Sequence, residues 1–245
     1  MKKLVLFIAI LFALSTSTNS QWYTITTPYN HNFNAVYFVD KNTGWICADS
    51  GLILHTTNRG TDWNLQESGT NKKLLDIKFV SSKIGWAIGL SGLILYTDNA
   101  GVSWNVQESG IINTLYSISS IDSQYCWISG NQGIILHTYN GGAIWSMQNF
   151  HVSLNLTSIY FIDQNKGWIG GYSYDSVFGA MAGIWRTENS GITWELQLMR
   201  GGVINEISFI NENNGWVSGL GDYILLTDDA GINWSNKPIP ETICT

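Results

Sequence analysis

Charged side chains are scarce in this sequence of 245 residues, because Lys, Arg, Asp and Glu together make up only 12% of it. Twelve residues are basic and 18 are acidic, so the formal net charge is −6 at pH 7. Proteins that bind nucleic acids neutralise phosphates with a patch of Lys and Arg side chains. The acidic balance therefore argues against nucleic acid as a partner.

Cysteine is also scarce. Cys47, Cys126 and Cys244 give an odd count at wide spacings, which predicts neither a disulfide framework nor a metal site. Cys47 and Cys126 fall where other repeats carry small or apolar residues, so both are interpreted as core residues. His55 and His137 share one repeat position with unrelated residue types, which argues against a metal pair. We predict no cofactor and no metal.

Long apolar runs are missing except at the start of the chain. Lys2 and Lys3 precede the apolar stretch from residue 4 to 14, which is too short for a confident membrane span. Small residues follow it before Gln21, as expected for a cleaved leader. We predict a signal peptide over residues 1–20, a mature domain over residues 21–245 and a secreted or periplasmic protein without a further transmembrane segment.

The abundant feature is an eight-residue motif, T-x-[DN]-x-G-x-x-W, which occurs five times. A second tryptophan precedes the Thr of each copy by 11 residues, except in the fourth copy, where the gap is 19. These tryptophans are Trp45, Trp86, Trp127, Trp168 and Trp216. The period is thus 41 residues with one insertion. Repeats of about 40–45 residues indicate propeller blades.

Each period contains four short runs of alternating apolar residues, bounded by Gly, Asn, Asp and Ser, which predict four strands. The fold class is therefore all-β, a propeller of four-stranded antiparallel blades. We expect inner strands near residues 33–39, 74–80, 115–121, 156–162 and 204–210. Trp22 adds the start of one further strand. Three arrangements remain open: the N-terminal strand closes a five-bladed ring, the C-terminal tail closes it, or the chain is part of a larger propeller.

The motif residues themselves are interpreted as turn formers. Thr hydroxyls and Asn or Asp side chains hydrogen-bond turn amides, Gly supplies a positive φ, and Trp packs against the blade. Repetition also argues against catalysis, because an active site is usually unique. The residues are Asn58, Gly60, Trp63, Asn99, Gly101, Trp104, Asn140, Gly142, Trp145, Asn189, Gly191, Trp194, Asp229, Gly231 and Trp234.

This motif resembles the Asp-box (BNR) repeat, and the longer phrase GW..G..G.IL.T.N.G..W..Q.SG resembles the propeller family of the photosystem II assembly and stability factor. The resemblance extends from Trp22 to Trp234. It implies a protein-binding, assembly-factor-like module that presents an arginine-rich patch to a membrane-protein partner. This chain departs from that expectation, since its arginines are only Arg59, Arg186 and Arg200.

Asp-box propellers also include sialidases and glycoside hydrolases. A sialidase needs three arginines on the substrate carboxylate and an Arg-Ile-Pro phrase, which is missing here, so sialidase chemistry is disfavoured. A glycosidase needs a facing pair of carboxylates, for which Asp49, Asp175 and Asp222 are candidates. Carbohydrate binding or glycoside hydrolysis therefore remains the alternative to a non-catalytic protein-binding module.

The predicted binding site is on the face opposite the Asp boxes. That face collects the most varied side chains and the insertion GYSYDSVFGAMA at residues 171–182, which we expect to be an irregular loop. Loops on rigid scaffolds are where binding residues concentrate, although a tolerated surface insertion is an equal alternative. The partner is a protein or a surface glycan, and the candidate residues are Asp49, His151, Tyr172, Tyr174, Asp175, Arg200 and Asp222.

Overall fold

The computed structural model describes residue 27 and residues 29–176, 179–220 and 224–237. The expected signal peptide and Trp22 lie outside these residues, as do Asp222 and Cys244. The leader therefore stays a prediction.

The strands form five four-stranded sheets, in which each strand pairs antiparallel with the next one along the chain. Blade 1 contains β1 (Phe33–Phe38), β2 (Gly44–Ala48), β3 (Ile53–Thr56) and β4 (Asn64–Gln66), and blade 2 contains β5 (Leu74–Phe79), β6 (Gly85–Gly89), β7 (Ile94–Thr97) and β8 (Asn105–Gln107). Blade 3 contains β9 (Leu115–Ser120), β10 (Cys126–Gly130), β11 (Ile135–Thr138) and β12 (Ser146–Met147). Blade 4 contains β13 (Asn155–Phe161), β14 (Gly167–Asp175), β15 (Gly179–Thr187) and β16 (Glu195–Gly201), and blade 5 contains β17 (Val203–Phe209), β18 (Gly215–Leu220), β19 (Ile224–Thr227) and β20 (Ser235–Lys237).

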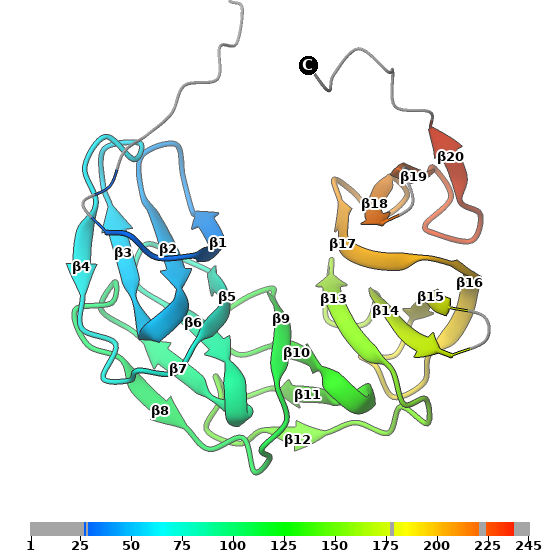
Figure 1. Ribbon diagram of the computed structural model, residues 1–245, viewed down its shortest axis with the longest axis horizontal. Helices are drawn as coiled ribbons and strands as arrows, with labels where there is room; N and C mark the ends of the chain where they lie inside the picture. Colours follow the sequence, from blue (N-terminus) through cyan, green and yellow to red (C-terminus); the bar gives the residue numbers. More distant parts are fainter. Residues whose placement is uncertain (1–26, 28, 177–178, 221–223, 238–245) are drawn as a thin grey trace, which may run out of the picture.

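The blades follow one another around an arc, with the first strand of each blade toward its centre and blades 1 and 5 at its two ends (Figure 1). The inner strands of successive blades contact each other, from β1 on β5 to β13 on β17. All five inner strands begin and end within one residue of the predicted ranges. The predicted propeller architecture is thus confirmed. The fourth strand of blade 5 is formed by residues 235–237, which directly follow Trp234.

Aromatic stacking joins one blade to the next. The Trp45 ring on β2 stacks on the Phe79 ring of blade 2 with centroids 3.5 Å apart, and the edge of Phe79 meets Trp104 of its own blade at 5.9 Å. Trp127 with Phe161 and Trp168 with Phe209 repeat this stack at 3.8 and 3.6 Å. Because Trp45, Trp127 and Trp168 are completely buried, these stacks remove large apolar rings from water, which stabilises the contact between blades.

Blade 3 shows how closely the stack depends on its neighbours. In the other blades the Phe that ends the inner strand lies over a cross-strand Gly, and a Cβ added at Gly85 would meet the Phe79 ring at 2.6 Å. In blade 3 the same pair is Ser120 and Cys126. The smaller Ser120 leaves room for the Cys126 side chain, which is buried and free. This supports the interpretation of Cys126 as a core residue.

The Asp-box turn is held by its Thr and Asn side chains. In the second copy, the Thr97 hydroxyl accepts the Gly101 N–H at 2.9 Å and donates to the Asn99 side chain at 2.9 Å. Asn99 Oδ1 in turn accepts the N–H of Ser103 at 3.0 Å. Gly101 has φ +84°, and Ala100 before it has φ +64°. The other four copies make the same Thr-to-Gly bond, so the boxes are structural turns.

Ala100, the non-glycine box residue with a positive φ, also joins two blades. Its carbonyl points back to blade 1, where it accepts hydrogen bonds from Trp45 Nε1 at 3.2 Å and from Gln66 Nε2 at 2.7 Å. Gln107 and Gln148 reach Gly141 and Ser190 of the following boxes in the same way. The Gln in the W..Q phrase therefore joins each of blades 1 to 3 to the Asp box of the next blade, whereas Gln197 of blade 4 donates to Glu195 O within its own strand.

Candidate binding surface

Two different faces result from the alternating strand directions. We call "Asp-box face" the side formed by the five boxes and the turns between the first and second strands. The box backbone contacts these turns, as where the Ala100 N–H donates to the Lys83 carbonyl. We call "hairpin face" the opposite side, formed by η1 (Asp49–Gly51), η2 (Leu90–Gly92), η3 (Asn131–Gly133) and the β14–β15 hairpin.

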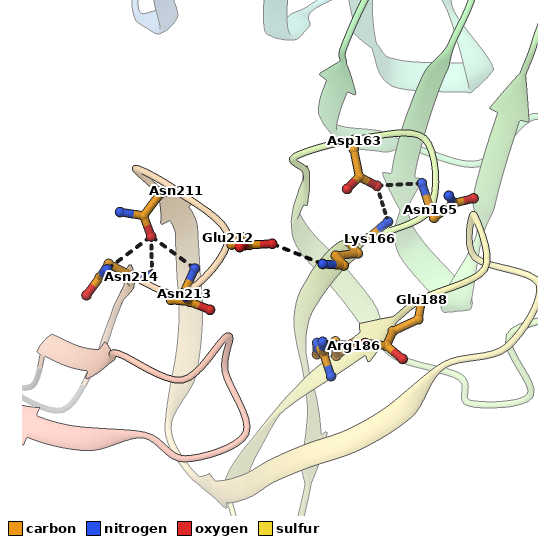
Figure 2. Close-up of polar contacts among 9 residues, drawn as sticks. All are labelled: Asp163, Asn165, Lys166, Arg186, Glu188, Asn211, Glu212, Asn213 and Asn214. Carbon is orange, nitrogen blue, oxygen red and sulfur yellow. Dashed lines mark hydrogen bonds and ion pairs between the residues drawn. The ribbon is translucent and has the colours of Figure 1, made fainter.

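The Asp-box face is occupied by turn-forming bonds. Figure 2 shows Asp163 accepting the N–H groups of Asn165 and Lys166, both at 2.7 Å, and Asn211 holding the equivalent turn of blade 5. Lys166 then forms an ion pair with Glu212 at 3.1 Å, which joins blades 4 and 5. These side chains stabilise the turns, and the repeated geometry leaves little that could distinguish one ligand from another.

On the hairpin face, Asp49 is already fully engaged. Its carboxylate accepts hydrogen bonds from Asn34 at 3.0 Å and Asn32 at 3.1 Å, and forms an ion pair with Lys73 of the neighbouring blade at 2.9 Å. These bonds, that from Asn34 most strongly, lower the pKa of Asp49 to about 2. Asp49 thus stabilises the contact between blades 1 and 2 rather than presenting a free carboxylate.

The insertion is more regular than we expected. β14 and β15 stay in register to the pair Asp175 and Gly179, so a two-stranded hairpin extends from blade 4 where the sequence suggested an irregular loop. That expectation was wrong because the inserted residues keep strand alternation on both sides of the turn. Tyr174, 78% exposed, lies on this hairpin. The side chain of Asp175 lies outside what the structure describes, as does Asp222.

Two other candidate residues flank the base of the hairpin. Tyr172 pairs with Ala182 on β15, and Ala182 pairs with Arg200 on β16, so the two candidates lie on either side of one residue. Tyr172 is half-buried against the core shared by blades 4 and 5. The Arg200 guanidinium donates to Asn236 of blade 5 at 3.0 Å. The structure therefore brings Tyr172, Tyr174 and Arg200 together on neighbouring strands. We call these three residues the "hairpin cluster".

His151 and Asp49 belong to other parts of the arc. His151 is exposed in the connection between β12 and β13, and Asp49 begins η1 in blade 1. The candidate set is thus divided into one cluster on blade 4 and two separate residues.

The inner strands enclose a hollow that the sequence reasoning missed. A cavity of about 480 Å³ lies between them. Its walls carry the charged residues Asp76, Lys78 and Glu206 and the aromatic residues Tyr37, Tyr116 and Tyr160. The Lys78 ammonium lies 4.4 Å from the centre of the Tyr37 ring, a cation–π contact. We call this region the "channel".

Electrostatics distinguish the channel from the rest of the surface. Loss of solvation between the strands raises the pKa of Asp76 to about 6, against hydrogen bonds from the Ile118 and Ile77 N–H groups. The pKa of Glu206 rises to about 7 through partial desolvation and then the nearby Asp76 charge, although this side chain keeps contact with solvent at the end of the arc. Burial also lowers the pKa of Lys78.

The wall of the channel lies near Tyr172 of the hairpin. Burial raises the pKa of the Tyr116 hydroxyl in the channel wall, and the nearby Tyr172 raises it further. We therefore treat the hairpin cluster and the channel as neighbouring parts of one candidate surface, with tyrosines, one guanidinium group, one ammonium group and two carboxyls.

A register signal in the sequence points to these residues. Asp76 and Glu206 precede the buried Ile of their inner strands, where blades 3 and 4 carry serines and blade 1 an alanine. The serines accept the N–H of the next blade's Ile, as Ser158 accepts Ile207 N–H at 2.9 Å. A carboxylate at a position otherwise held by Ser or Ala is the deviation that would have identified the channel.

In the part of the chain that the structure describes, no set of three or more His, Cys, Asp or Glu side chains could hold a metal ion. The described residues also include no helix with the length and apolar character needed to cross a membrane.

Comparison with protein families shows to which family the repeats belong. Residues 61–198 match the family described as "Photosynthesis system II assembly factor YCF48". The chain belongs to this family. A comparison with curated proteins found no match.

Solved structures support the same fold. "YCF48 bound to D1 peptide" is similar with a TM-score of 0.53 and 14% identity, covering 86% of this chain and 82% of that one. YCF48 from Cyanidioschyzon merolae is similar with a TM-score of 0.51 and 16% identity over 87% of both chains. The GH74 enzyme of Niastella koreensis reaches a TM-score of 0.67 at 14% identity, covering 84% of this chain but only 38% of that one. At such identities the likeness shows the fold alone.

Proposed function

We propose that this protein is an exported, non-catalytic propeller that binds a polypeptide partner at the hairpin cluster and the mouth of the channel. The observation that carries the proposal is membership of the YCF48 family, one of whose structures is described as bound to a D1 peptide. The surface chemistry supports it, because the exposed Tyr174 and the half-buried tyrosines next to charged groups suit peptide backbones and mixed side chains.

The partner we propose is not a photosynthetic one. The arginines of this chain do not gather into a patch: Arg59 donates to Asn42 and Arg186 pairs with Glu188, both beside Asp boxes, whereas Arg200 lies on blade 4 near the hairpin. The charged groups in the channel wall are the two carboxyls of Asp76 and Glu206 and the single ammonium group of Lys78. A partner that relies on a cationic patch would find little to bind, so we propose a peptide with cationic and apolar side chains.

Binding to such a peptide is tested with a display library of random linear peptides, selected on the immobilised protein. Enriched peptides would then be measured in solution by fluorescence anisotropy. Failure of any sequence to enrich above a bare-surface control would contradict a peptide-binding function.

We expect Tyr174→Ser to weaken the binding of an enriched peptide by about fivefold, since an exposed tyrosine at an interface centre contributes on the order of 1 kcal/mol. The thermal midpoint should hardly change, because Tyr174 is 78% exposed. Val102→Ser is the matched control, since Val102 is 80% exposed on the Asp-box face. Weaker binding in the control and not in Tyr174→Ser would move the site to that face.

Carbohydrate processing is the second candidate function, supported by the fold likeness to GH74 enzymes. A glycosidase needs two available carboxyls. Asp49 is occupied by three partners, and each oxygen of Asp76 accepts a backbone N–H, at 2.8 and 2.9 Å. Glu206 is then the remaining channel carboxyl, so we rank hydrolysis below peptide binding. Release of reducing ends from xyloglucan oligosaccharides, abolished by Glu206→Gln, would reverse this order.

Export is proposed on the leader pattern alone. Expression of the full chain in a bacterial host with fractionation of periplasm and medium, followed by N-terminal sequencing, tests it. A mature product that begins at Gln21 is expected, and retention of Met1 in a cytoplasmic product would contradict export.

A further inference from the structure

The contact between neighbouring blades repeats along the arc, so the chemistry that each of its two sides binds is visible within the chain. We call "front" the side of a blade that carries the second-strand Trp, and "back" the side that carries the inner-strand Phe. A front face binds a back face through the stacked rings, as in Trp168 on Phe209 at 3.6 Å. The indole N–H of Trp168 also donates to the Asp-box carbonyl of Ala230 at 2.9 Å.

At one end of the arc no described blade covers the front face of blade 5. Trp216 of blade 5 holds the position of Trp168 but is 38% exposed, whereas Trp168 is completely buried. Beside it lies a hollow of about 350 Å³, lined in part by Gly215, Leu226 and Lys237. Where one blade packs on the next, the Gly of the next Asp box fills the corresponding space. Between blades 1 and 2, for example, Gly101 lies so close to Gln66 that an added Cβ would meet its side chain at 2.0 Å.

At the other end no described blade covers the back face of blade 1. Val36 is 60% exposed and Phe38 is 39% exposed, although their counterparts Ile77 and Phe79 are both 1% exposed. Arg59 holds the box position of Ala100, with φ +66°. Within the described residues no hydrogen bond reaches its carbonyl oxygen, whereas the Ala100 carbonyl accepts two from the preceding blade.

The polar groups at the two ends also match. Ser158 of blade 4 accepts the N–H of Ile207 in blade 5. Glu206 is the residue of blade 5 at the position of Ser158, and Val36 is the residue of blade 1 at the position of Ile207. An acceptor is thus present at one end, and the corresponding donor at the other.

We infer that the front face of blade 5 binds the back face of blade 1 of a second copy of this chain, head to tail. In this contact Trp216 stacks on Phe38 of the second copy, its indole N–H donates to the Arg59 carbonyl, and Glu206 accepts the Val36 N–H. The two faces lie at opposite ends of the arc (Figure 1), so one described chain does not bring them together. A second copy is the occupant because its blade 1 carries the ring, the box carbonyl and the N–H in the required register.

Such a contact joins unlike faces, so a bound pair leaves one front face and one back face available. Head-to-tail contacts of this type form closed rings or open chains. Two variants that each lose one face can form a single contact together, and this property distinguishes the inferred contact from a symmetric dimer.

The test uses the purified protein and the variants Trp216→Glu and Phe38→Glu, with Val36→Glu as a second back-face variant in case Phe38→Glu fails to fold. Far-UV circular dichroism and thermal midpoints verify folding. Light scattering after size exclusion, across a concentration series, gives the mass of each protein alone and of equimolar mixtures.

We expect the unmodified protein to associate as its concentration rises and each variant to stay at the monomer mass. A mixture of the Trp216 variant with a back-face variant should show twice that mass and nothing larger, since only one intact contact is available. A wild-type protein that stays monomeric, association that survives both substitutions, or a mixture that stays monomeric while the wild type dimerises would each overturn the inference.

Discussion

Replacing Trp168 with alanine is expected to lower the free energy of unfolding by about 4 kcal/mol, the range observed when a fully buried aromatic side chain is removed. The substitution removes the stack on Phe209 and the hydrogen bond to the Ala230 carbonyl. Both contacts cross from blade 4 to blade 5, so the substitution weakens the packing between these two sheets. The indole is completely buried, which leaves a cavity that the rigid strands around it cannot fill.

The repeat supplies a matched control in Trp216, which has the same position in blade 5 but is 38% exposed. Trp216→Ala should change the free energy of unfolding by less than about 1 kcal/mol, as usual for surface positions. Urea midpoints of the two variants, measured at a concentration where the protein is monomeric, provide the comparison. Equal losses would show that Trp216 is covered in solution and that the arc closes on itself.

The repeat made most of the fold predictable from the sequence. A 41-residue period containing four alternating runs predicts blades, and the turn chemistry of Thr, Asn and Gly predicts where each third strand ends. Thr97, Asn99 and Gly101 make the bonds expected of them. Such bonds are local, within five residues, and a local pattern is sufficient to predict them.

What the sequence could not predict depends on how blades meet. Alternation predicts that Asp76 lies on the opposite side of its strand from Ile77. It also places Lys78 on the same side as Asp76, but it does not say that this side faces Glu206 and three tyrosines across a channel, because those neighbours come from other blades. The hairpin was missed for a different reason: the insertion interrupts the repeat and carries Gly, Ser and Asp residues, which are common in loops, whereas cross-strand pairing between β14 and β15 keeps it extended.

The ends of the arc show the same limit of prediction from the sequence. Phe38 and Trp216 have the sequence context of buried residues, and their repeat positions predict burial. Their exposure arises only because blade 1 has no blade before it, and blade 5 none after it, among the described residues. A periodic pattern identifies the contact that a residue can make, but the partner has to be supplied by the assembly.

The channel carboxyls are expected to make stability depend on pH between about 4 and 7. Glu206 has a folded-state pKa of about 7 against an ordinary value of 4.5, and Asp76 about 6 against 3.8. The folded protein therefore binds more protons than the unfolded chain in this range, and the free energy of unfolding falls as pH rises. The half-buried His55 and His137 act in the opposite direction, since burial lowers their pKa values. Only a comparison with a variant isolates the carboxyls.

Glu206→Gln is that variant. Relative to the wild type, it should gain about 1.5 kcal/mol in free energy of unfolding between pH 5 and pH 8, half of what the full pKa change would give, because part of the carboxylate remains in solvent. Glu212→Gln, which removes a carboxylate from the exposed ion pair with Lys166, is the control and should follow the wild type closely. Urea unfolding of all three proteins at both pH values provides the measurement. A Glu206→Gln curve parallel to the wild type would show that the channel side of β17 is as well solvated as open surface, and that Glu206 lies outside the electrostatic influence of Asp76.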